Sequence, residues 1–423
     1  MPGAARRLVV IGQGYVGLPL AMRAVAVGFD VTGYEIDPAR VARLEEGDSY
    51  IEDISSAQLR DAIATGRYRA TTDARDISGF DVAVITVPTP LRDTLPDLSH
   101  IEAAARTLSA ALAPGALVIL ESTTYPGTTE ELLVPLLAEG SHLTIGDEVL
   151  VGYSPERIDP GNTEWTFVST PKVVSGINAA SLEAVQEFYD QLVEQTVPVS
   201  SPKEAELTKL LENTFRHVNV ALVNELAMFA GELGIDVWEA IDAASTKPFG
   251  FMRFVPGPGV GGHCLPVDPS YLSWQVRRSL GESFRFVELA NDVNAHMPSY
   301  VVRRLTRALN DRGRAVKGTR VLLLGLGYKR NTGDARESPA VVVASQLAAL
   351  GAELRAADPF VSDEVLAGQL TRVDCTVTEL SAADAVVMLT DHDAFDVKTI
   401  AEHARYVLDC RRVVPAGDGV EFL

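Results

Sequence analysis

The chain has 423 residues, of which 47% are hydrophobic and 22% charged, and its formal net charge at pH 7 is −20. This length predicts two or three domains, and the apolar content suffices for large cores and argues against extensive disorder. The acidic balance disfavours nucleic acid or an anionic membrane as a partner, so any phosphate must be bound by local groups.

The cysteines and the apolar runs limit the class of protein further. Cys264, Cys375 and Cys410 are few and widely spaced, which indicates neither a disulfide framework nor a metal site and favours a reducing, cytoplasmic compartment. The N-terminus has no long apolar segment with a small-residue cleavage site. No stretch of about 18 uninterrupted apolar residues predicts a membrane span.

Apolar, β-rich runs alternate with helical patterns in the first third of the chain. The runs fall at residues 8–11, 31–34, 82–87 and 117–120. Continuous apolar strands separated by helices predict a parallel sheet with helices on both faces. Residues 1–199 are therefore expected to form a doubly wound domain.

The pattern becomes helical near residue 200. Ser201, Pro202 and Glu204 have the order of an N-cap, a first-turn proline and a capping-box glutamate, and they open a long helical stretch. Further helical runs follow at residues 271–280 and 299–309. Residues 200–310 are expected to form a helical middle domain.

The last third returns to the alternating pattern, and residues 311–423 are expected to form a third domain. Its predicted elements are a strand and turn at 320–327, a helix at 339–350, and strands at 354–357, 385–389 and 406–409. The fold class expected for the whole chain is α/β, with two Rossmann-like doubly wound domains joined by a helical middle domain with a long central helix.

Residues 12–17, Gly-Gln-Gly-Tyr-Val-Gly, form a GxGxxG motif that follows the first predicted strand and opens a helical pattern. Such glycines give a tight turn, a close approach of backbone to a pyrophosphate, and a helix–strand contact. Glu35, at the end of the next strand, suits the ribose hydroxyls and would repel a 2′-phosphate, so NAD is favoured over NADP. Asp37 is close enough to compete for this role, and Arg40 either faces the adenosine side or is solvated.

Two further strands are followed by segments rich in proline and hydroxyl groups. Pro88-Thr89-Pro90 follows the third predicted strand, and residues 121–129 follow the fourth. Ligands of doubly wound sheets bind at these carboxyl ends, where hydroxyls can contact a cofactor or an ordered water. Ordinary turn chemistry is the alternative reading.

Lys209 and Asn213 lie four residues apart on the long predicted helix and so share one face. Their apolar neighbours suggest a buried lysine that exchanges protons near neutrality and an amide that holds a developing oxyanion. Glu156 lies in a loop after a strand-like run, where it could act as a general base through water. Spacing alone favours the alternative that it pairs with its neighbour Arg157 or with solvent.

Residues 257–268 form a glycine-rich loop with one thiol, Cys264, and a carboxylate, Asp268, four residues later. Glycines permit torsions and close approaches that a Cβ forbids, so this loop can seat a ligand against a nucleophile. An isolated cysteine of this kind is more often a small buried hydrophobic residue, so its role depends on the other motifs in the sequence.

Gly325 and Gly327 also follow a predicted strand, but Arg330 stands where a third glycine would fall. A second NAD site is therefore not expected. Lys329 and Arg336 bring two cations to the carboxyl end of this strand, where they suit an anionic ligand or pair with nearby acids.

In this order the motifs resemble those of the nucleotide-sugar 6-dehydrogenases, the family of UDP-glucose, GDP-mannose and UDP-N-acetylhexosamine dehydrogenases. The resemblance covers nearly the whole chain and implies a four-electron oxidation of a sugar C6 alcohol to a carboxylate, with two NAD used in turn. It rests on Gly12-x-Gly14-x-x-Gly17, Val87-Pro88-Thr89-Pro90, residues 122–127, Ser154-Pro155-Glu156, residues 205–213, Gly261-Gly262-His263-Cys264 with Asp268, and residues 325–329 with 334–339.

The resemblance also implies roles for single residues. Cys264 would form a thiohemiacetal and then a thioester, Lys209 and Asp268 would manage the alcohol proton, and Asn213 would stabilise the C6 oxygen. Glu156 and Thr124 would position the water that hydrolyses the thioester. The implied cofactor-binding residues are Gly12, Gly14, Tyr15, Val16, Gly17, Glu35, Arg40, Pro88, Thr89, Thr124 and Arg336. The implied substrate-binding residues are Glu156, Arg157, Lys209, Asn213, Gly261, Gly262 and Lys329.

Two positions depart from the glucose-type pattern. His263 precedes the thiol in place of serine, and Val267 precedes Asp268 in place of lysine. This form is more similar to the branch that acts on UDP-N-acetylglucosamine or UDP-N-acetylmannosamine, while glucose on uridine or thymidine diphosphate stays open as a substrate. A two-electron 3-hydroxy-acid dehydrogenase and a silent nucleotide-sugar-binding protein are the alternatives, and a homodimer formed through the helical segment is expected.

Overall fold

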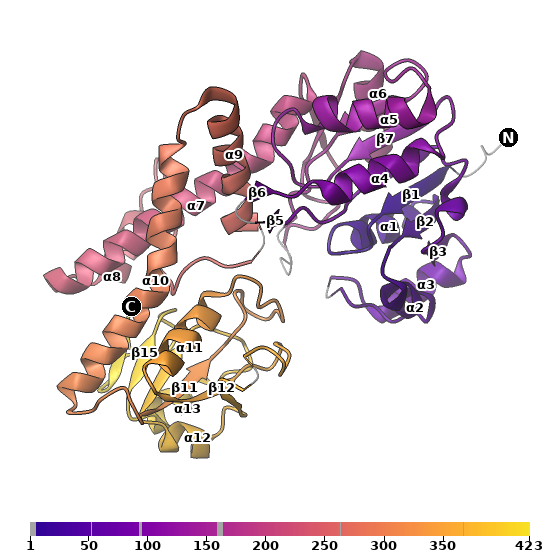
Figure 1. Cartoon of the computed structure of the whole chain (residues 1–423). Helices are drawn as coiled ribbons and strands as arrows, with labels where there is room; N and C mark the ends of the chain where they lie inside the picture. Colours follow the sequence, from indigo (N-terminus) through magenta and orange to yellow (C-terminus); the bar gives the residue numbers. More distant parts are fainter. Residues whose placement is uncertain (1–5, 52, 93–94, 159–163, 263, 367) are drawn as a thin grey trace. The chain divides into compact units, whose positions relative to one another are not determined.

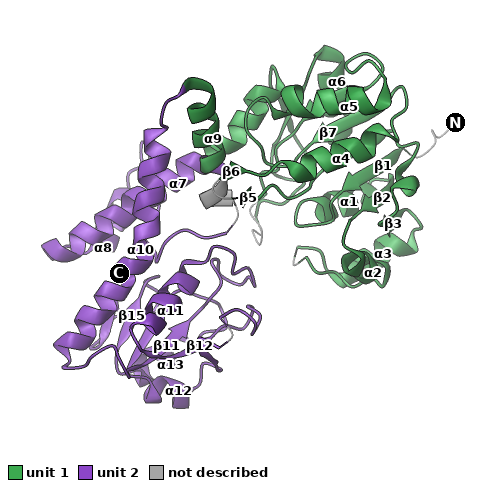
Figure 2. Cartoon of the chain, in the orientation of Figure 1, with its two compact units in different colours: residues 1–212, 270–280 green, residues 213–269, 281–423 purple. Residues whose placement is uncertain are grey.

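A computed structural model describes residues 6–51, 53–92, 95–158, 164–262, 264–366 and 368–423, with the side chains of residues 264–267 outside this description. The chain divides into two compact units, residues 1–212 with 270–280 and residues 213–269 with 281–423 (Figure 2). The divisions fall inside helices α7 (Pro202–Leu233) and α9 (Cys264–Leu280).

Unit 1 is built on an eight-stranded sheet in the order β10-β9-β8-β7-β4-β1-β2-β3. All neighbouring strands are parallel except β8 and β9. The strand order reverses at β1, whose neighbours are β2 and β4, so a crevice for ligands is expected at the carboxyl ends there. The strands are β1 (Arg7–Ile11), β2 (Asp30–Tyr34), β3 (Tyr68–Thr71), β4 (Val82–Ile85), β7 (Leu117–Leu120), β8 (Leu150–Tyr153), β9 (Lys172–Gly176) and β10 (Thr196–Pro198), with a separate antiparallel pair, β5 (Leu91–Arg92) and β6 (Leu95–Pro96).

Helices cover both faces of this sheet because successive residues of its strands point to opposite sides. In β1, Leu8 and Val10 join the core that holds α1, α2, α3 and α6. Val9 and Ile11 join the core that holds α4 and α5, which lie together over one face in Figure 1. The helices are α1 (Gly17–Ala26), α2 (Pro38–Glu45), α3 (Ser56–Ala64), α4 (Ser99–Ser109), α5 (Val134–Ser141) and α6 (Ala179–Tyr189), with a 3₁₀ turn at Ala74–Ile77 and a π-helical turn at Thr129–Leu133.

Unit 2 contains an all-parallel, six-stranded sheet in the order β13-β12-β11-β14-β15-β16. Val321 and Leu323 of β11 pack against α10 and α11, and Leu322 and Leu324 pack against α12 and α13. The strands are β11 (Arg320–Leu324), β12 (Glu353–Ala357), β13 (Thr371–Arg372), β14 (Ala385–Met388), β15 (Val407–Asp409) and β16 (Val420–Phe422). The further helices are α8 (Val237–Ser245), α10 (Arg285–Asp311), α11 (Pro339–Ala349), α12 (Val377–Ala382) and α13 (Val397–His403).

The predicted α/β class, with two parallel sheets and a long helix near residue 200, is confirmed. Two boundaries differ from the prediction. Helix α9 begins at Cys264, so the end of the predicted glycine loop is helical. Proline is tolerated at position 266 because it lacks only a backbone N–H, and N–H groups in the first turn have no acceptor within the helix. Helix α10 runs through Pro298 and starts well before the predicted residue 299.

Within the described ranges, no helix combines the length and the apolar character needed to cross a bilayer. Nor do three His, Cys, Asp or Glu side chains gather there into a group that could hold a metal ion.

Candidate functional site

The glycine motif at residues 12–17 forms the turn between β1 and α1. Gly12 has a φ of +92°, and a Cβ on Gly17 would lie 1.9 Å from the carbonyl oxygen of Gly12, so neither position accepts a side chain. A Cβ on Gly14 would meet nothing within 4 Å, so the backbone there is open to a ligand. Tyr15 is exposed, and Val16 occupies the position just before α1 in the same turn. The turn therefore has the shape that a pyrophosphate requires.

Glu35 follows β2 and is the carboxylate that lies against this turn. Its Oε2 accepts a hydrogen bond from the amide of Gln13 at 3.1 Å, and the residue is only 6% exposed. Asp37 instead accepts from the amide of Ala39 and caps α2. Arg40 lies between the two acids, 3.6 Å from Oε2 of Glu35 and 3.8 Å from Oδ2 of Asp37. Of the two candidate acids, Glu35 has the position of a ribose ligand.

We predict that Glu35→Gln weakens NAD binding roughly tenfold or more, because a charge-assisted hydrogen bond contributes about 1.5–3 kcal/mol. Asp37→Asn is the matched control and should change the dissociation constant less than about threefold, since its side chain caps α2 and lies near Arg40 instead of bonding to the turn. Calorimetric titration of both variants with NAD checks this. Equal losses in the two variants would contradict the assignment of Glu35.

The segments after β4 and β7 lie where the sequence predicted ligand contacts. Pro88 is exposed and Thr89 is buried. The carbonyl of Thr89 accepts a hydrogen bond from Tyr271 of α9 at 2.9 Å, and Trp274 packs on Tyr125 with ring centroids 5.0 Å apart. The distal part of α9 thus holds both loops within unit 1.

Thr124 lies in a buried turn that is hydrogen-bonded to α7. Its hydroxyl donates to Oγ1 of Thr128 at 2.5 Å. Glu206 of α7 accepts from the amides of Gly127 and Thr129, at 2.5 and 2.9 Å, and from the Thr129 hydroxyl at 2.7 Å. Burial raises the pKa of Glu206 to about 7, although these hydrogen bonds oppose the shift. Sequence reasoning missed Glu206 as a functional residue.

Because the pKa of Glu206 is raised above its ordinary value, the folded protein loses stability as pH rises from about 5 to about 8. The side chain of Glu206→Gln cannot ionise, so we expect this variant to be less stable than wild type at pH 5. Between pH 5 and pH 8 its free energy of unfolding should rise by roughly 3 kcal/mol relative to that of wild type. Thermal unfolding at both pH values checks this. Glu232→Gln, at an exposed position of the same helix, should show no such change, and a constant difference between Glu206→Gln and wild type would contradict the shift.

Helix α7 turns its polar side chains inward and its large apolar side chains outward. One stripe, spanning roughly 60° around the axis, is exposed; its members are Phe215, Leu222, Leu226, Phe229 and Leu233. The opposite side is buried and polar; its members are Glu206, Lys209, Asn213, His217 and Asn224. Lys209 and Asn213 are each 8% exposed, so the expectation that they are buried is confirmed, although most of the leucines around them are not.

Asn213 and Asp268 are brought together in unit 2. The Asn213 amide nitrogen donates to Oδ2 of Asp268 at 2.6 Å, and the aspartate is fully buried. Asp268 lies in α9, four residues after Cys264, which is the first residue of that helix. His263 and the side chains of Cys264 and Val267 lie outside the described residues. The structure thus joins two motifs that are 55 residues apart in sequence.

A buried polar chain supports the glycine loop ahead of this pair. The amide of Gly257 donates to Oδ1 of Asn224 at 3.0 Å, and Asn224 donates to Oδ1 of Asn294 at 2.9 Å. Nε2 of His217 lies 2.8 Å from Oδ1 of Asn291, and burial lowers the pKa of this histidine. Side chains of α7 and α10 therefore fix the backbone of the loop.

The glycine loop also packs on the second glycine motif. A Cβ on Gly261 would lie 2.6 Å from Cβ of Tyr328, and one on Gly262 would lie 2.7 Å from its ring. The amide of Gly262 donates to the carbonyl of Arg336 at 3.0 Å. Only glycine fits at these two positions, and the loop therefore runs along the segment that carries Lys329 and Arg336.

The turn after β11 does not repeat the open turn after β1. Its amides at Leu326 and Gly327 donate to Oδ2 of Asp358, at 2.6 and 3.1 Å, and His392 lies 3.0 Å from the same oxygen. Burial opposes ionisation of Asp358, but these hydrogen bonds hold its pKa well below the ordinary value. A carboxylate thus occupies the amides that a pyrophosphate would use. Arg336 forms a bidentate ion pair with Asp334, with Nη2 and Oδ2 2.5 Å apart, which was one of the predicted alternatives.

Glu156 is buried and paired, but not with the arginine next to it. Its Oε1 accepts from the amides of Arg157 and Ile158, each at 2.7 Å, and its Oε2 lies 2.6 Å from Nζ of Lys172. The Arg157 side chain instead forms a bidentate ion pair with Glu212, with Nη2 and Oε1 2.6 Å apart. Of the alternatives for Glu156, pairing with the Arg157 side chain is not seen, and sequence reasoning missed Lys172.

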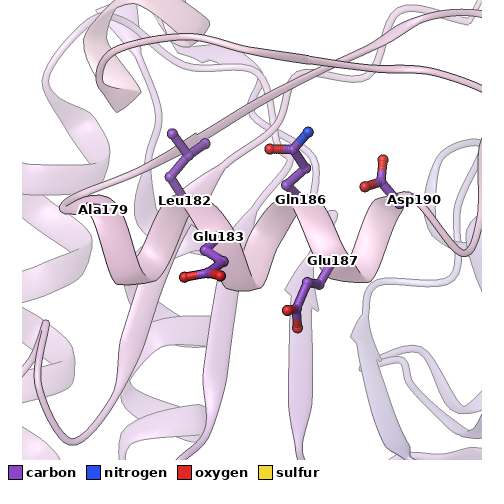
Figure 3. Close-up of a pocket in the computed structure, with 6 residues that line it drawn as sticks. All are labelled: Ala179, Leu182, Glu183, Gln186, Glu187 and Asp190. Atoms are coloured by element: carbon purple, nitrogen blue, oxygen red, sulfur yellow. The ribbon is translucent and has the colours of Figure 1, made fainter.

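A hollow of about 300 Å³ on α6 is not part of this site (Figure 3). It is lined by Ala179, Leu182, Glu183, Gln186, Glu187 and Asp190. Its three acids are exposed, and the lining belongs to one helix rather than to the carboxyl ends of the strands.

A doubly wound parallel sheet, a glycine turn open at Gly14, and a carboxylate at the end of β2 define the class: an NAD-binding dehydrogenase domain. The chain belongs to the UDP-glucose/GDP-mannose dehydrogenase family. It matches the NAD binding domain of that family over residues 6–193, the central domain over 203–296 and the UDP binding domain over 322–416. It is thus an oxidoreductase with NAD as its cofactor, and the family predicted from the sequence is confirmed.

Several relatives are named for acetamido sugars, the branch that the loop pattern resembles. The chain is 34% identical to a UDP-N-acetyl-D-mannosamine dehydrogenase of Pyrococcus horikoshii, with 96% of each chain covered. It is 36% identical to a UDP-N-acetyl-D-glucosamine 6-dehydrogenase of Pseudomonas aeruginosa, with 92% of this chain and 91% of the relative covered. The solved Pyrococcus horikoshii structure, 34% identical, superposes with a TM-score of 0.90 and 98% of each chain covered.

Proposed function

We propose that the protein oxidises the C6 alcohol of a UDP-N-acetylhexosamine to the uronic acid, releasing four electrons to two NAD in turn. The observation that carries this proposal is the buried contact of Asn213 with Asp268, which joins the α7 motif to the helix that begins at Cys264. The acetamido-sugar substrates named for the relatives support the choice of sugar. The product would serve the synthesis of a polysaccharide or glycoconjugate.

In the first oxidation, Lys209 and Asp268 would take the proton of the C6 hydroxyl. Both residues are buried, Lys209 with 8% and Asp268 with 0% of its surface exposed. The Asn213 amide, fixed by Asp268, would hold the C6 oxygen as charge develops on it. NAD, when bound at the glycine turn beside Glu35, supplies the hydride acceptor for each oxidation.

Cys264 would act in the second oxidation. Its thiolate would add to the C6 aldehyde to give a thiohemiacetal, and loss of hydride would give a thioester. Its position at the end of the glycine loop, where α9 begins, supports this role. Water held by Glu156 and Thr124 would then hydrolyse the thioester and return the thiol.

The nucleotide sugar would bind along the glycine loop and the third domain. Gly261 and Gly262 pack on Tyr328, which precedes Lys329 in the chain, and the cation of Lys329 suits a diphosphate. Arg411 adds a guanidinium near Gly257, with its Nε donating to the carbonyl of Leu389 at 2.7 Å. We propose that Arg157 acts through its backbone amide, which fixes Glu156.

We propose three functional domains, residues 1–199, 200–310 and 311–423, and a cytoplasmic homodimer. The exposed apolar stripe of α7 supports the dimer, because a second copy can cover it; Phe229, for example, is 58% exposed. The free thiols of Cys375 and Cys410 suit a reducing compartment.

Replacing two members of the stripe, Leu226→Asp with Phe229→Asp, should convert the dimer to a monomer at micromolar concentration, because each charge would be buried without a partner. Sedimentation velocity checks this. Asp substitution of Val342, an exposed apolar residue on α11, is the control and should leave the dimer intact. A monomeric wild-type protein would contradict the assembly.

A panel of nucleotide sugars, followed by NADH absorbance, tests the substrate. We expect UDP-N-acetylglucosamine or UDP-N-acetylmannosamine to give the highest kcat/KM. UDP-glucose, TDP-glucose, GDP-mannose and a 3-hydroxy acid complete the panel. Preference for TDP-glucose would keep the reaction and change the substrate, whereas turnover of the hydroxy acid alone would overturn the proposal.

A further inference from the structure

Three charged side chains meet in the interior of unit 1, and only one of them has a role in the proposed reaction. Nζ of Lys172, at the start of β9, lies 2.6 Å from Oε2 of Glu156 and in direct contact with Oε1 of Glu121, which follows β7. Each of the three residues is 7% exposed or less. Sequence separations of 51 and 16 residues show that the fold assembles this group.

The group has two carboxyls for one ammonium, so it carries one unbalanced negative charge when both carboxyls are ionised. Replacing so costly a buried arrangement with apolar residues is often neutral or stabilising, which makes stability a poor explanation for it. Tyr189 donates to Oε2 of Glu121 at 2.7 Å, and both oxygens of Glu156 are held by donors. The geometry is therefore suited to storing one proton between fixed partners.

The two carboxyls are not equivalent. Burial raises the pKa of Glu121 to about 7, against the opposing charge of Lys172. Burial also opposes ionisation of Glu156, but the charge of Lys172 and the hydrogen bonds to its oxygens hold its pKa near 2. The pair therefore titrates as a unit. Two backbone amides donate to Glu156 in addition to Lys172 and favour its ionised form, so Glu121 is the better place for a shared proton.

We propose that Glu121, Lys172 and Glu156 form a proton relay for thioester hydrolysis, in which Glu156 takes the proton of the attacking water and Glu121 stores it. This inference rests on the proposed function. As the water oxygen bonds to the thioester carbon, its proton passes to Glu156; the C–S bond then breaks and its electron pair leaves with the Cys264 thiolate. Lys172 gives one proton to Glu121 and regains one from Glu156, so the ammonium is unchanged and Glu156 is again a carboxylate. Glu121 later releases the proton to solvent.

The groups facing Glu121 come from each element packed on it. They are Lys172 of β9, Glu156 of the segment after β8, and Tyr189 of α6, while the Tyr153 hydroxyl points to the carbonyl of Ser122 at 3.4 Å. The ring of Tyr189 also lies 5.2 Å from Nζ of Lys172 and helps to hold the ammonium. Glu121→Gln keeps an acceptor for Lys172 and a polar partner for Tyr189, so we expect this variant to fold.

The first test needs no substrate. Infrared titration of the full chain between pH 5 and 9 should show protonated carboxyl bands that disappear near neutrality. One of them should be missing in Glu121→Gln and a different one in Glu206→Gln, since Glu206 also titrates near pH 7. An unchanged spectrum in Glu121→Gln would show that Glu121 stores no proton and would overturn the proposal.

The second test follows a single turnover with UDP-N-acetylglucosamine or UDP-N-acetylmannosamine, measuring thioester formation and hydrolysis separately. In Glu121→Gln we expect hydrolysis to slow at least tenfold at pH 7.5 and to lose its inflection near neutrality, with thioester formation within threefold of wild type. Lys172→Met should slow hydrolysis as well, and Lys172→Arg should restore most of the rate. Lys203→Met, at an exposed ion pair of the same unit, is the control.

The outcomes distinguish a failure of the proton relay from a failure of the proposed dehydrogenase reaction. Wild-type hydrolysis in Glu121→Gln with an unchanged pH profile would overturn the relay and leave the dehydrogenase reaction standing. Failure of the wild-type protein to oxidise any nucleotide sugar would overturn the reaction and with it the relay's role in hydrolysis, whatever the infrared spectra show.

Discussion

Cys264→Ala should abolish formation of the sugar acid, with a loss of at least about a thousandfold in kcat for the complete oxidation. The thiol is the only group proposed to form a bond to the sugar carbon, so nothing replaces it. NAD binding should stay within about twofold of wild type, because the glycine turn and Glu35 belong to the other unit. Product analysis by mass spectrometry and calorimetric titration with NAD check the two parts.

Cys375→Ala is the matched control, since Cys375 is a free, partly exposed thiol of the UDP binding domain and has no role in the proposed reaction. Burial raises the pKa of this thiol to about 11, so it is a poor nucleophile at neutral pH. Wild-type acid formation by Cys264→Ala would contradict covalent catalysis, and loss of activity in both variants would point to a general effect on folding.

Glu156→Gln should slow thioester hydrolysis roughly a hundredfold to ten-thousandfold, the range typical of a lost general base. The thioester would then accumulate as a covalent adduct on Cys264. The amide keeps an acceptor for the backbone donors at Arg157 and Ile158, so the loop should hold its shape. Intact-protein mass spectrometry after rapid quenching measures the adduct directly.

Glu183→Gln, on the exposed side of α6, is the control and should show no adduct beyond that of wild type. Normal hydrolysis by Glu156→Gln would remove Glu156 from the reaction. Loss of thioester formation itself would instead assign Glu156 to an earlier step.

Local sequence pattern predicted the sheets and the cofactor turn because both depend on short-range rules. Apolar runs of four or five residues fix strands such as β1 and β11, and glycine at positions 12, 14 and 17 is required by torsion and close approach. The same rules misplace boundaries where proline is tolerated, as in the first turn of α9 and within α10.

Helix α7 shows where pattern reasoning fails. A soluble helix usually buries its apolar stripe, yet here Leu222 and Phe229 are exposed while Glu206 and Asn224 are buried. Only the tertiary contacts reveal this, because the hydrogen-bond partners of Glu206 lie 77 and 79 residues away. Resemblance to a family identified Lys209 and Asn213 on that face, but it did not identify Glu206.

Local sequence patterns did not identify the relay residues Glu121 and Lys172 either. Lys172 stands among apolar residues at the start of a strand that the sequence analysis did not predict, and Glu121 was read only as part of a loop. Their contact depends on the pairing of β7, β8 and β9 in one sheet. Such groups become visible only when strands distant in sequence are neighbours.

The stoichiometry of NADH to sugar acid tests the central claim most directly. Limiting UDP-N-acetylglucosamine or UDP-N-acetylmannosamine is incubated with excess NAD, and both products are quantified at completion. The four-electron reaction through Cys264 predicts two NADH for each uronic acid and no free aldehyde. One NADH for each sugar, with an aldehyde or ketone as the product, would contradict it.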